Sequence, residues 1–311
     1  MPGLSSAAAR PVRGRPWMAR LIAPLLRPPA MGERLFSRCA NPRCSTGWMR
    51  LWRSRRAPLF EGRWACSPEC MAEVVRWAVR RETGGDADST PGHRERYAHR
   101  IPLGLMLVEQ GRISAGELRA ALTLQKQMGD ERVKLGRWLV ESGVLSETIL
   151  TRALGAQWNC PVLPLGCWNP GEVASAMPRL LSEAAGAVPV RAPGGKLLYV
   201  AFCEGVDRTL GYALERMLGM RVSAGMALET EFQRAQAEYM EMPGPRTRFL
   251  EADAGPALAR AIVKLIERER PAEARLVRVQ DYYWLRMWKG APGRQRLSDC
   301  DGIEDVVASI L

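Results

Sequence analysis

Two close pairs of cysteines lie within one short stretch of the sequence. Cys39 and Cys44 enclose Ala-Asn-Pro-Arg, Cys66 and Cys70 enclose Ser-Pro-Glu, and 21 residues separate the two pairs. This spacing lets four thiolates converge tetrahedrally on one zinc ion. Because a segment of about 45 residues is too short to bury a large apolar core, the metal would supply much of its folding free energy. The sequence therefore predicts a structural zinc site, and a set of incidental free cysteines is the alternative.

The residues around the second cysteine pair resemble the start of a helix. Ser67 and Pro68 are typical of the first positions, so Cys70 is expected in the first turn of a helix that continues through Val74, Val75 and Ala78. This order predicts a small treble-clef-like zinc finger. Three tryptophans are expected to cover its core, although neighbouring arginines leave stacking on nucleic-acid bases open as an alternative: they are Trp48, Trp52 and Trp64.

The sequence offers no recognisable catalytic residues. Its two histidines, His93 and His99, lie around a polar stretch, and no nucleophile or acid-base pair has a familiar setting. No GxxxxGK-[ST] loop is present, and the nearest string, at 193–196, falls in an expected hairpin without a helix behind it to receive a phosphate. We therefore expect a protein that is not an enzyme.

Basic residues are concentrated in the first third of the chain. The formal net charge is +12, and residues 1–100 contain 19 arginines against eight acidic residues. Such an excess can bind nucleic acid, an anionic membrane surface or an acidic protein, and a solvated, partly disordered leader is the alternative. Four zinc-bound thiolates would lower the effective charge by about two. The metal therefore disfavours a nucleic-acid partner.

Cysteine placement and hydropathy indicate a cytoplasmic protein. Four cysteines cluster, which favours metal binding in a reducing compartment, whereas Cys160, Cys167, Cys203 and Cys300 are dispersed. No apolar run reaches the roughly 18 residues that a membrane-spanning helix needs. We expect no transmembrane segment.

The strongest internal signal is a repeat. Residues 102–125 read PLGLMLVEQGRISAGELRAALTLQ, residues 134–157 read KLGRWLVESGVLSETILTRALGAQ, and 11 of the 24 positions are identical. Apolar residues at helical spacing, then glycine, an aliphatic-Ser pair and a second helical run predict one helix-turn-helix pair used twice. Gly111 and Gly143 suit the turns, and Ser114 and Ser146 are placed to cap the second helices. Only the first copy has a capping box, because its Glu117 is replaced by an isoleucine in the second.

Alternating helical and strand patterns follow the repeat. We expect a helix near 171–185, a hairpin of VPVRA and KLLYVAFC, a helix over 209–218, a short strand through 220–222 and a helix over 229–239. After MPGPRTR comes a helix over 257–269 and two strands, EARLVRVQ and YYWLRMWKG. The aromatic residues of the last strand are expected to pack the sheet, while strand addition by a partner at an exposed edge is the alternative.

The repeat resembles a known family. The pattern of Leu-Gly, two residues, Leu-Val, two residues, Gly, six residues, Leu, three residues, Leu, two residues and Gln occurs in both copies. It is similar to the tandem motif of the MshEN-type domain, also described as the N-terminal domain of type II secretion protein E. The similarity continues through 158–240, including the VPVRAPGGKLLYVAF hairpin. The resemblance implies a domain of secretion and pilus ATPases without their motor core.

Members of this family bind cyclic di-GMP, and a site of two similar halves suits a ligand with two phosphates and two guanines. Aliphatic side chains would contact the bases, and amides at helix starts would hold phosphate. The first copy has Pro102 where the family has a basic residue, with Arg100 two positions earlier, and the spacer over 126–133 is longer than usual. The residues that the resemblance implies are Arg100, Leu103, Gly104, Leu107, Val108, Gly111, Leu118, Leu122 and Gln125 for one half, and Lys134, Leu135, Gly136, Leu139, Val140, Gly143, Leu150, Leu154 and Gln157 for the other.

These patterns together predict an α+β protein: a tandem helical-hairpin repeat, a small mixed α/β subdomain, a treble-clef-like zinc finger and a C-terminal α-β-β unit. The expected divisions are a disordered basic tail (1–34), a four-cysteine zinc-finger-like domain (35–81), a linker (82–96), the MshEN-like domain (97–241), a second linker (242–250) and the C-terminal unit (251–311). The expected function is a sensor of cyclic di-GMP, or an adaptor, that contacts another protein such as a secretion or pilus component. The alternatives are a zinc-dependent nucleic-acid-binding protein and a ligand-free structural adaptor.

Overall fold

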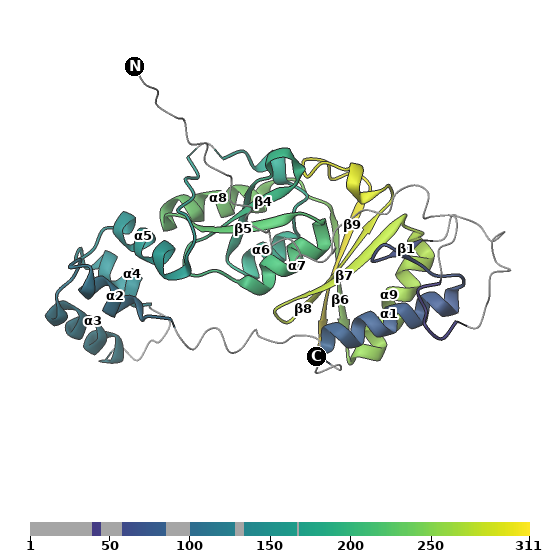
Figure 1. Cartoon of the computed structure of the whole chain (residues 1–311), viewed down its shortest axis with the longest axis horizontal. Coiled ribbons are helices and arrows are strands. Elements are labelled where there is room, and N and C mark those ends of the chain that lie inside the picture. Colours follow the sequence, from purple (N-terminus) through teal and green to yellow (C-terminus); the bar gives the residue numbers. More distant parts are fainter. Residues whose placement is uncertain (1–38, 45–57, 85–99, 128–133, 167) are drawn as a thin grey trace, which may run out of the picture. The chain divides into compact units, whose positions relative to one another are not determined.

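The computed structural model describes residues 39–44, 58–84, 100–127, 134–166 and 168–311 (Figure 1). Several sequence-based predictions lie outside these residues: the tail at 1–34, Trp48 and Trp52, the linker residues 85–96, the histidines and most of the spacer. Within the described part of the chain, no helix combines the length and the apolar character needed to cross a membrane. The described residues form a mixed α+β structure with two sheets, and the α+β class is the one that the sequence predicted.

Each copy of the repeat folds as a helical hairpin. The helices are α2 (Leu103–Glu109), α3 (Ala115–Gln127), α4 (Leu135–Glu141) and α5 (Glu147–Trp158). Ser114 and Glu117 form the expected capping box: the Glu117 amide donates to the Ser114 hydroxyl (3.1 Å) and the Ser114 amide donates to the Glu117 carboxylate (2.6 Å). Gly111 and Gly143 adopt left-handed φ of 63° and 73°. The local prediction of these turns is confirmed.

The two hairpins lie side by side, and each contributes its equivalent helices to the contact between them. α2 contacts α5, α3 contacts α4, and α2 also contacts α4. A Cβ added at Gly104 would lie 2.6 Å from Leu118 and 3.2 Å from Leu135, while one at Gly136 would lie 2.8 Å from Leu150 and 3.5 Å from Leu103. Each motif glycine therefore permits close approach of a leucine from its own hairpin and of one from the other.

A three-stranded sheet follows the repeat. Its order is β3 (Ala187–Arg191), β4 (Leu197–Phe202) and β5 (Arg221–Met226), with β3 and β4 antiparallel as the predicted hairpin and β5 parallel to β4. Helices α7 (Arg208–Leu218) and α8 (Glu229–Glu241) agree with the expected ones. The helix expected near 171–185 is instead a 3-10 turn, η4 (Pro170–Val173), and a short α6 (Arg179–Ala184), because Pro178 caps a new helix.

The second sheet differs from the expectation in its extent. It has six strands in the order β2-β1-β7-β8-β9-β6, and it contains strands from both ends of the described chain. These are β1 (Leu59–Phe60), β2 (Arg63–Trp64), β6 (Arg246–Ala252), β7 (Glu273–Val279), β8 (Tyr282–Trp288) and β9 (Ile303–Ile310).

Two sequence-based assignments of the C-terminal region were wrong. Most of the expected linker at 242–250 is strand β6, which is ordered because it pairs in parallel with β9 over its whole length. The C-terminal unit is therefore β-α-β-β-β and not α-β-β, with α9 (Gly255–Glu269) as its helix. Nor does the finger segment stand apart from it, since β1 pairs in parallel with β7. Cys39–Leu311 forms one compact unit.

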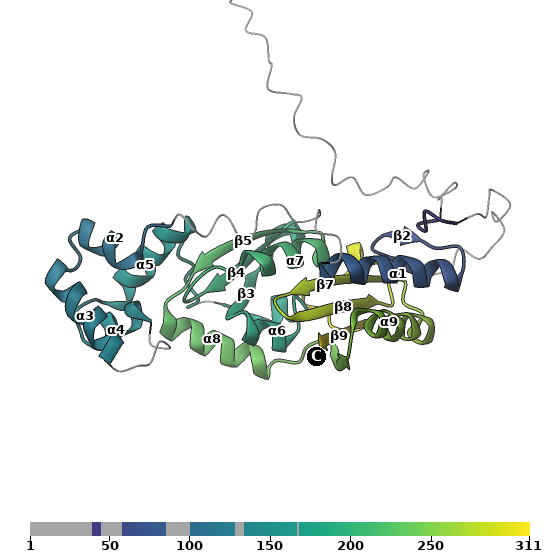
Figure 2. The same cartoon turned by 90° about the horizontal axis from the view of Figure 1, so that it is seen from below.

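Both faces of the six-stranded sheet are covered. Helices α1 (Pro68–Thr83) and α9 lie against one face, where Leu276 and Leu285 point, and they run beside each other in both views (Figures 1 and 2). On the opposite face, Val277 and Trp284 join the core of the repeat and the three-stranded sheet. Alternation along each strand thus places one sheet between two apolar layers. The aromatic residues of β8 pack the sheet as expected, with Tyr283, Trp284 and Trp288 all buried.

A buried ion pair lies on the second of these faces. Arg286 makes two hydrogen bonds of 2.7 Å to the Asp305 carboxylate, which also accepts one of 2.8 Å from the Trp284 indole. The remaining guanidinium nitrogen donates to the Ser175 carbonyl (2.7 Å), next to η4. Because both charges are fully buried, the pair is stable only with all of these partners in place.

Candidate functional site

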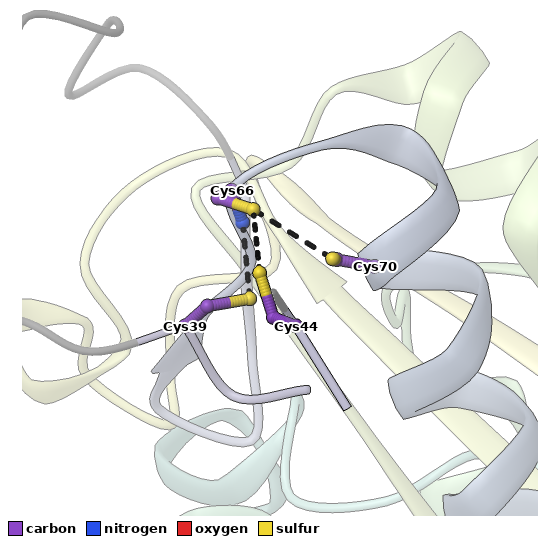
Figure 3. Close-up of side chains that lie close together, drawn as sticks. All are labelled: Cys39, Cys44, Cys66 and Cys70. Atoms are coloured by element: carbon purple, nitrogen blue, oxygen red, sulfur yellow. Dashed lines mark hydrogen bonds between the residues drawn. The ribbon is translucent and has the colours of Figure 1, made fainter. Parts of the chain in front are cut away.

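The four predicted metal-binding cysteines come together at one place (Figure 3). Cys39 and Cys44 flank a tight turn, Cys66 follows strand β2, and Cys70 lies in the first turn of α1. Their sulfur atoms all lie within 4.8 Å of one another, with Cys44 to Cys66 at 3.4 Å and Cys66 to Cys70 at 3.6 Å. Four sulfurs at about 2.3 Å from one zinc ion would be separated by roughly 3.8 Å. The cluster has the donor set and the spacing of such a site.

Local hydrogen bonds explain why these segments converge. The Ser67 hydroxyl accepts from the Cys70 amide (3.3 Å) and so fixes the start of α1, as the sequence predicted. In the turn, the Ala40 amide donates to the Trp64 carbonyl (2.8 Å), which ties the first cysteine pair to β2. The Asn41 side chain donates to the sulfur of Cys70 (3.4 Å). The turn, hairpin and helix therefore hold four sulfurs together from three elements.

Without a metal, the Cys39 thiol of the cluster favours its protonated form. Burial raises its pKa to about 12, and side-chain hydrogen bonds with Cys66 and Cys70 contribute to the increase, whereas backbone hydrogen bonds with Cys66 and Asn41 act to lower it. A bound metal ion acts in the opposite direction, because it stabilises the thiolate strongly enough to deprotonate a coordinating thiol. The donated hydrogen bonds to sulfur are of the kind that orient metal ligands.

The structure divides the predicted nucleotide-binding residues of the repeat into two groups. Several are buried in the hairpin pair and serve packing: Gly104, Leu107, Leu118, Gly136, Leu139, Leu150 and Leu154. The remaining ones have partly or fully accessible side chains or turn backbone: Arg100, Leu103, Val108, Gly111, Leu122, Gln125, Lys134, Leu135, Val140, Gly143 and Gln157. The glycines of the Leu-Gly pairs thus face leucines of the protein itself rather than a free surface.

A cavity of about 420 Å³ lies where the second hairpin meets the three-stranded sheet. Lys134 and Trp158 line it from the repeat, and Cys203, Glu204 and Asp207 line it from the loop between β4 and α7. Its volume falls within the range typical of small-molecule sites. Lys134 forms an ion pair with Glu204 across this cavity, and both side chains are exposed.

Two further predicted residues are placed close to the cavity. The Arg100 guanidinium carbon lies 3.2 Å from the centre of the Trp158 ring, so the basic residue before the first copy stacks on the end of the second. Gln157 donates to the Ile101 carbonyl (2.8 Å) and also connects the end of the second copy with the start of the first. Arg100, Lys134 and Gln157 therefore gather at one end of the hairpin pair.

Sequence reasoning missed the sheet side of this cavity. Glu204 and Asp207 lie in a loop some 70 residues after Lys134 in the sequence, and no spacing pattern links them. Burial raises the pKa of Cys203 to about 12, and the negative charge of Glu204 adds to the increase. The Asp207 carboxylate caps α7 by accepting from the Thr209 amide (2.8 Å). The cavity thus combines one lysine with carboxylates that can accept hydrogen bonds from amino and imino groups.

Comparisons with known proteins found similarity to part of a pilus assembly ATPase and to solved structures of two other proteins. No protein-family model matches the chain. The type IV pilus assembly ATPase PilB of Myxococcus xanthus (strain DK1622) is 27% identical over 154 residues, which is 49% of this chain and 26% of the ATPase. The match thus spans about a quarter of that relative. Among solved structures, MshE with cdg aligns at 28% identity and TM-score 0.38, over 45% of this chain and 99% of the other. The N-terminal domain of XpsE aligns at 15% identity and TM-score 0.34, over 43% and 91%.

Proposed function

We propose that the chain is a non-enzymatic regulatory protein of the cytoplasm that binds cyclic di-GMP, as the resemblance of its repeat to the MshEN or GspE N-terminal type of domain implies. The observation that carries the proposal is the gathering of Arg100, Lys134 and Gln157 at one end of the paired hairpins, beside the cavity. A cation there can hold a phosphate, and Glu204 and Asp207 can accept hydrogen bonds from a guanine edge. The cavity volume of about 420 Å³ is near the lower end of the range for small-molecule sites, so we place the rest of the ligand on the accessible surface of the hairpins.

Calorimetric titration of the full-length chain with cyclic di-GMP tests the proposal. Lys134→Ala removes a charged contact to phosphate, so we expect the affinity to fall by about tenfold or more. Lys264→Ala is the matched control, because Lys264 is an exposed lysine of α9, outside both the hairpins and the lining of the cavity. Absence of heat at high micromolar ligand would reject the sensing role. Binding that is equally weakened by both variants would reject the assignment of Lys134.

A second candidate function is a ligand-free adaptor of a secretion or pilus machine. It is favoured by the packing of Gly104 and Gly136 against leucines, which gives the motif a purely structural use. Exposed aliphatic side chains are also frequent on the first hairpin, where Ile101 and Leu105 are 57% and 58% exposed. Apolar surface of this kind suits contact with another protein. A pull-down with the purified cytoplasmic components of such a machine, with and without cyclic di-GMP, separates the two roles.

We also propose that Cys39, Cys44, Cys66 and Cys70 bind one structural Zn²⁺ as thiolates. The proposal rests on the sulfur spacing and on the turn, hairpin and helix that supply the ligands. Metal analysis of the purified chain should give one zinc per molecule. Cys44→Ser should lower this content severalfold, and Cys300→Ser, which changes a cysteine outside the cluster, should leave it unchanged. A metal-free protein that also fails to take up added zinc would reject the site.

A further inference from the structure

The finger segment and the C-terminal unit share a sheet although the 161 residues from 85 to 245 separate them in the sequence. Strand β1 pairs in parallel with β7, in register Leu59 with Glu273 and Phe60 with Ala274. The Leu59 amide donates to the Ala272 carbonyl (3.0 Å), and the Glu61 amide donates to the Ala274 carbonyl (2.8 Å). Without β1, strand β7 would be an edge strand with unpaired backbone groups.

The helices of the two segments also share one core. The start of α9 lies against the end of α1, since a Cβ at Gly255 would be 3.6 Å from Val79 and 3.5 Å from Thr83. Val75 and Ala78 of α1 are buried in one cluster with α9 and with the inner face of β7 and β8. Removing α1 would therefore expose the apolar face of the C-terminal sheet.

The cysteine cluster lies at the point where this shared structure begins. Cys70 and the adjacent Met71 are both buried in the same apolar cluster as α9, so a metal ligand is continuous with the core. Cys66 directly follows Ala65 at the end of the β1-β2 hairpin, which is also in that cluster. The strand pair and the helix start are thus fixed relative to each other at the four sulfurs.

We propose that metal binding at the cysteine site holds together one composite domain, formed by residues 39–44, 58–84 and 246–310, and that the repeat and the three-stranded sheet are inserted into this domain. The inference rests on the proposed zinc site and goes beyond it: loss of metal should release β7 and α9 as well as the finger segment. β1 and β2 have two residues each, which is too short for a stable hairpin alone. Their position depends on the metal cluster on one side and on β7 on the other.

Ionic contacts reinforce the same junction. Arg81 near the end of α1 forms two hydrogen bonds with Glu61 of the β1-β2 turn, at 2.6 Å and 2.8 Å. The Glu82 carboxylate accepts from the Arg278 amide at the end of β7 (3.1 Å) and from the Arg216 side chain of α7 (2.9 Å). Displacement of α1 would break contacts to β7 and to the inserted domain together.

Hydrogen-deuterium exchange of the full-length chain, read by mass spectrometry, tests the inference after metal analysis has established zinc. The zinc-loaded protein is compared with protein stripped by a chelator under reducing conditions, with protein to which zinc has been restored, and with Cys70→Ser and Cys300→Ser. We expect exchange in β7 and α9 to be at least tenfold faster after stripping, to recover on zinc addition, and to be fast in Cys70→Ser but unchanged in Cys300→Ser. Strands β3 and β4 serve as the internal reference.

The possible results distinguish failure of the zinc site from failure of the composite domain. Protein that binds no zinc defeats the zinc site itself, and the present inference with it. Zinc that is present and removable, with faster exchange confined to 58–84 while β7 and α9 keep their protection, overturns the composite domain and leaves the zinc site standing. If Cys70→Ser fails to fold, the stripped and restored wild-type protein still decides between these outcomes.

Discussion

Replacing Gly104 by alanine tests the pairing of the two hairpins directly. The new Cβ would lie 2.6 Å from Leu118 Cδ1, 3.3 Å from its Cδ2 and 3.2 Å from Leu135 Cδ2. Overpacking of this kind costs about 1–3 kcal/mol. Alanine is better than glycine in a helix by about 1 kcal/mol, which offsets part of the cost. Because two of the three atoms belong to a leucine that is itself buried, we take the upper part of the overpacking range, about 2–3 kcal/mol, and expect net destabilisation of about 1–2 kcal/mol.

Gly116→Ala provides a matched control in the same hairpin. Gly116 lies in α3, and the nearest atom to its added Cβ is the Ser114 hydroxyl at 3.7 Å. Only the greater helix preference of alanine over glycine then acts, so the Gly116→Ala variant should be more stable than the wild type by about 0.5–1 kcal/mol. The two substitutions have the same chemistry and opposite expected signs. Only the packing of α2 against its neighbours makes them differ.

Calorimetric melting of the full-length chain measures both variants. For a domain of this size about 1 kcal/mol corresponds to roughly 2–4 °C in Tm, so Gly104→Ala should melt about 2–8 °C lower and Gly116→Ala slightly higher. The double variant Gly104→Ala/Leu118→Ala should lose less stability than the sum of the losses in the two single variants, because the shortened side chain makes room for the new methyl group. If Gly104→Ala raised Tm as Gly116→Ala does, α2 and α4 could not pack as described.

Three further predictions follow from single contacts. Asp305→Asn leaves the Arg286 charge buried without its partner and should lower the unfolding free energy by about 3–5 kcal/mol in urea titration, whereas Arg286→Met/Asp305→Leu should cost less. Tyr239→Phe removes a buried hydroxyl that donates to the Met177 carbonyl (3.0 Å) and should cost about 1 kcal/mol by the same measurement. In the wild type, burial raises the pKa of Tyr239 to about 12, so the midpoint of its absorbance titration should lie above that of an exposed tyrosine. Hydrogen bonds from Ser114 hold the pKa of Glu117 below the usual glutamate range. The contribution of Glu117 to stability is therefore present at neutral pH and is lost as the pH falls through that lowered pKa. In Ser114→Ala, NMR titration should show that the pKa of Glu117 rises towards its usual value.

The features that sequence reasoning predicted are those decided by near neighbours. The capping box of Ser114 and Glu117, the left-handed Gly111 and Gly143 and the helix start before Cys70 depend on residues within a few positions. The convergence of the four cysteines was also predictable, because metal-ligand spacing is a local property of a turn and a helix start. Residue types at short spacing carry this information directly.

The missed features depend on partners far away in the chain. Strand β6, RTRFLEA, follows a Pro-Gly-Pro sequence and was assigned to a linker, yet it is a full strand because β9 pairs with it. Strand β1 has two residues and no periodic pattern to detect, and its partner β7 begins more than 200 residues later. The cavity likewise needs Lys134 from one segment and Glu204 from another. A single sequence has no local pattern that predicts these long-range pairings.

The arrangement of contacts determines where a bound ligand could act. The segment around η4 is held against the six-stranded sheet by the hydrogen bond from Arg286 to the Ser175 carbonyl, and Arg286 also forms the buried ion pair with Asp305. A displacement of this segment from the sheet would remove one partner of a buried charge, which is costly. At the cavity, Lys134 of the second hairpin forms an exposed ion pair with Glu204 of the loop between β4 and α7. Elsewhere, Glu147 at the start of α5 accepts a hydrogen bond from the Thr230 amide of α8, which is also an exposed contact. Exposed contacts of this kind contribute little stability and exchange readily with a ligand. A ligand shifts a protein only between states that it binds with different affinity. On the proposed function, an anion that competes with Glu204 for Lys134 would therefore act on the contact between the second hairpin and the loop between β4 and α7.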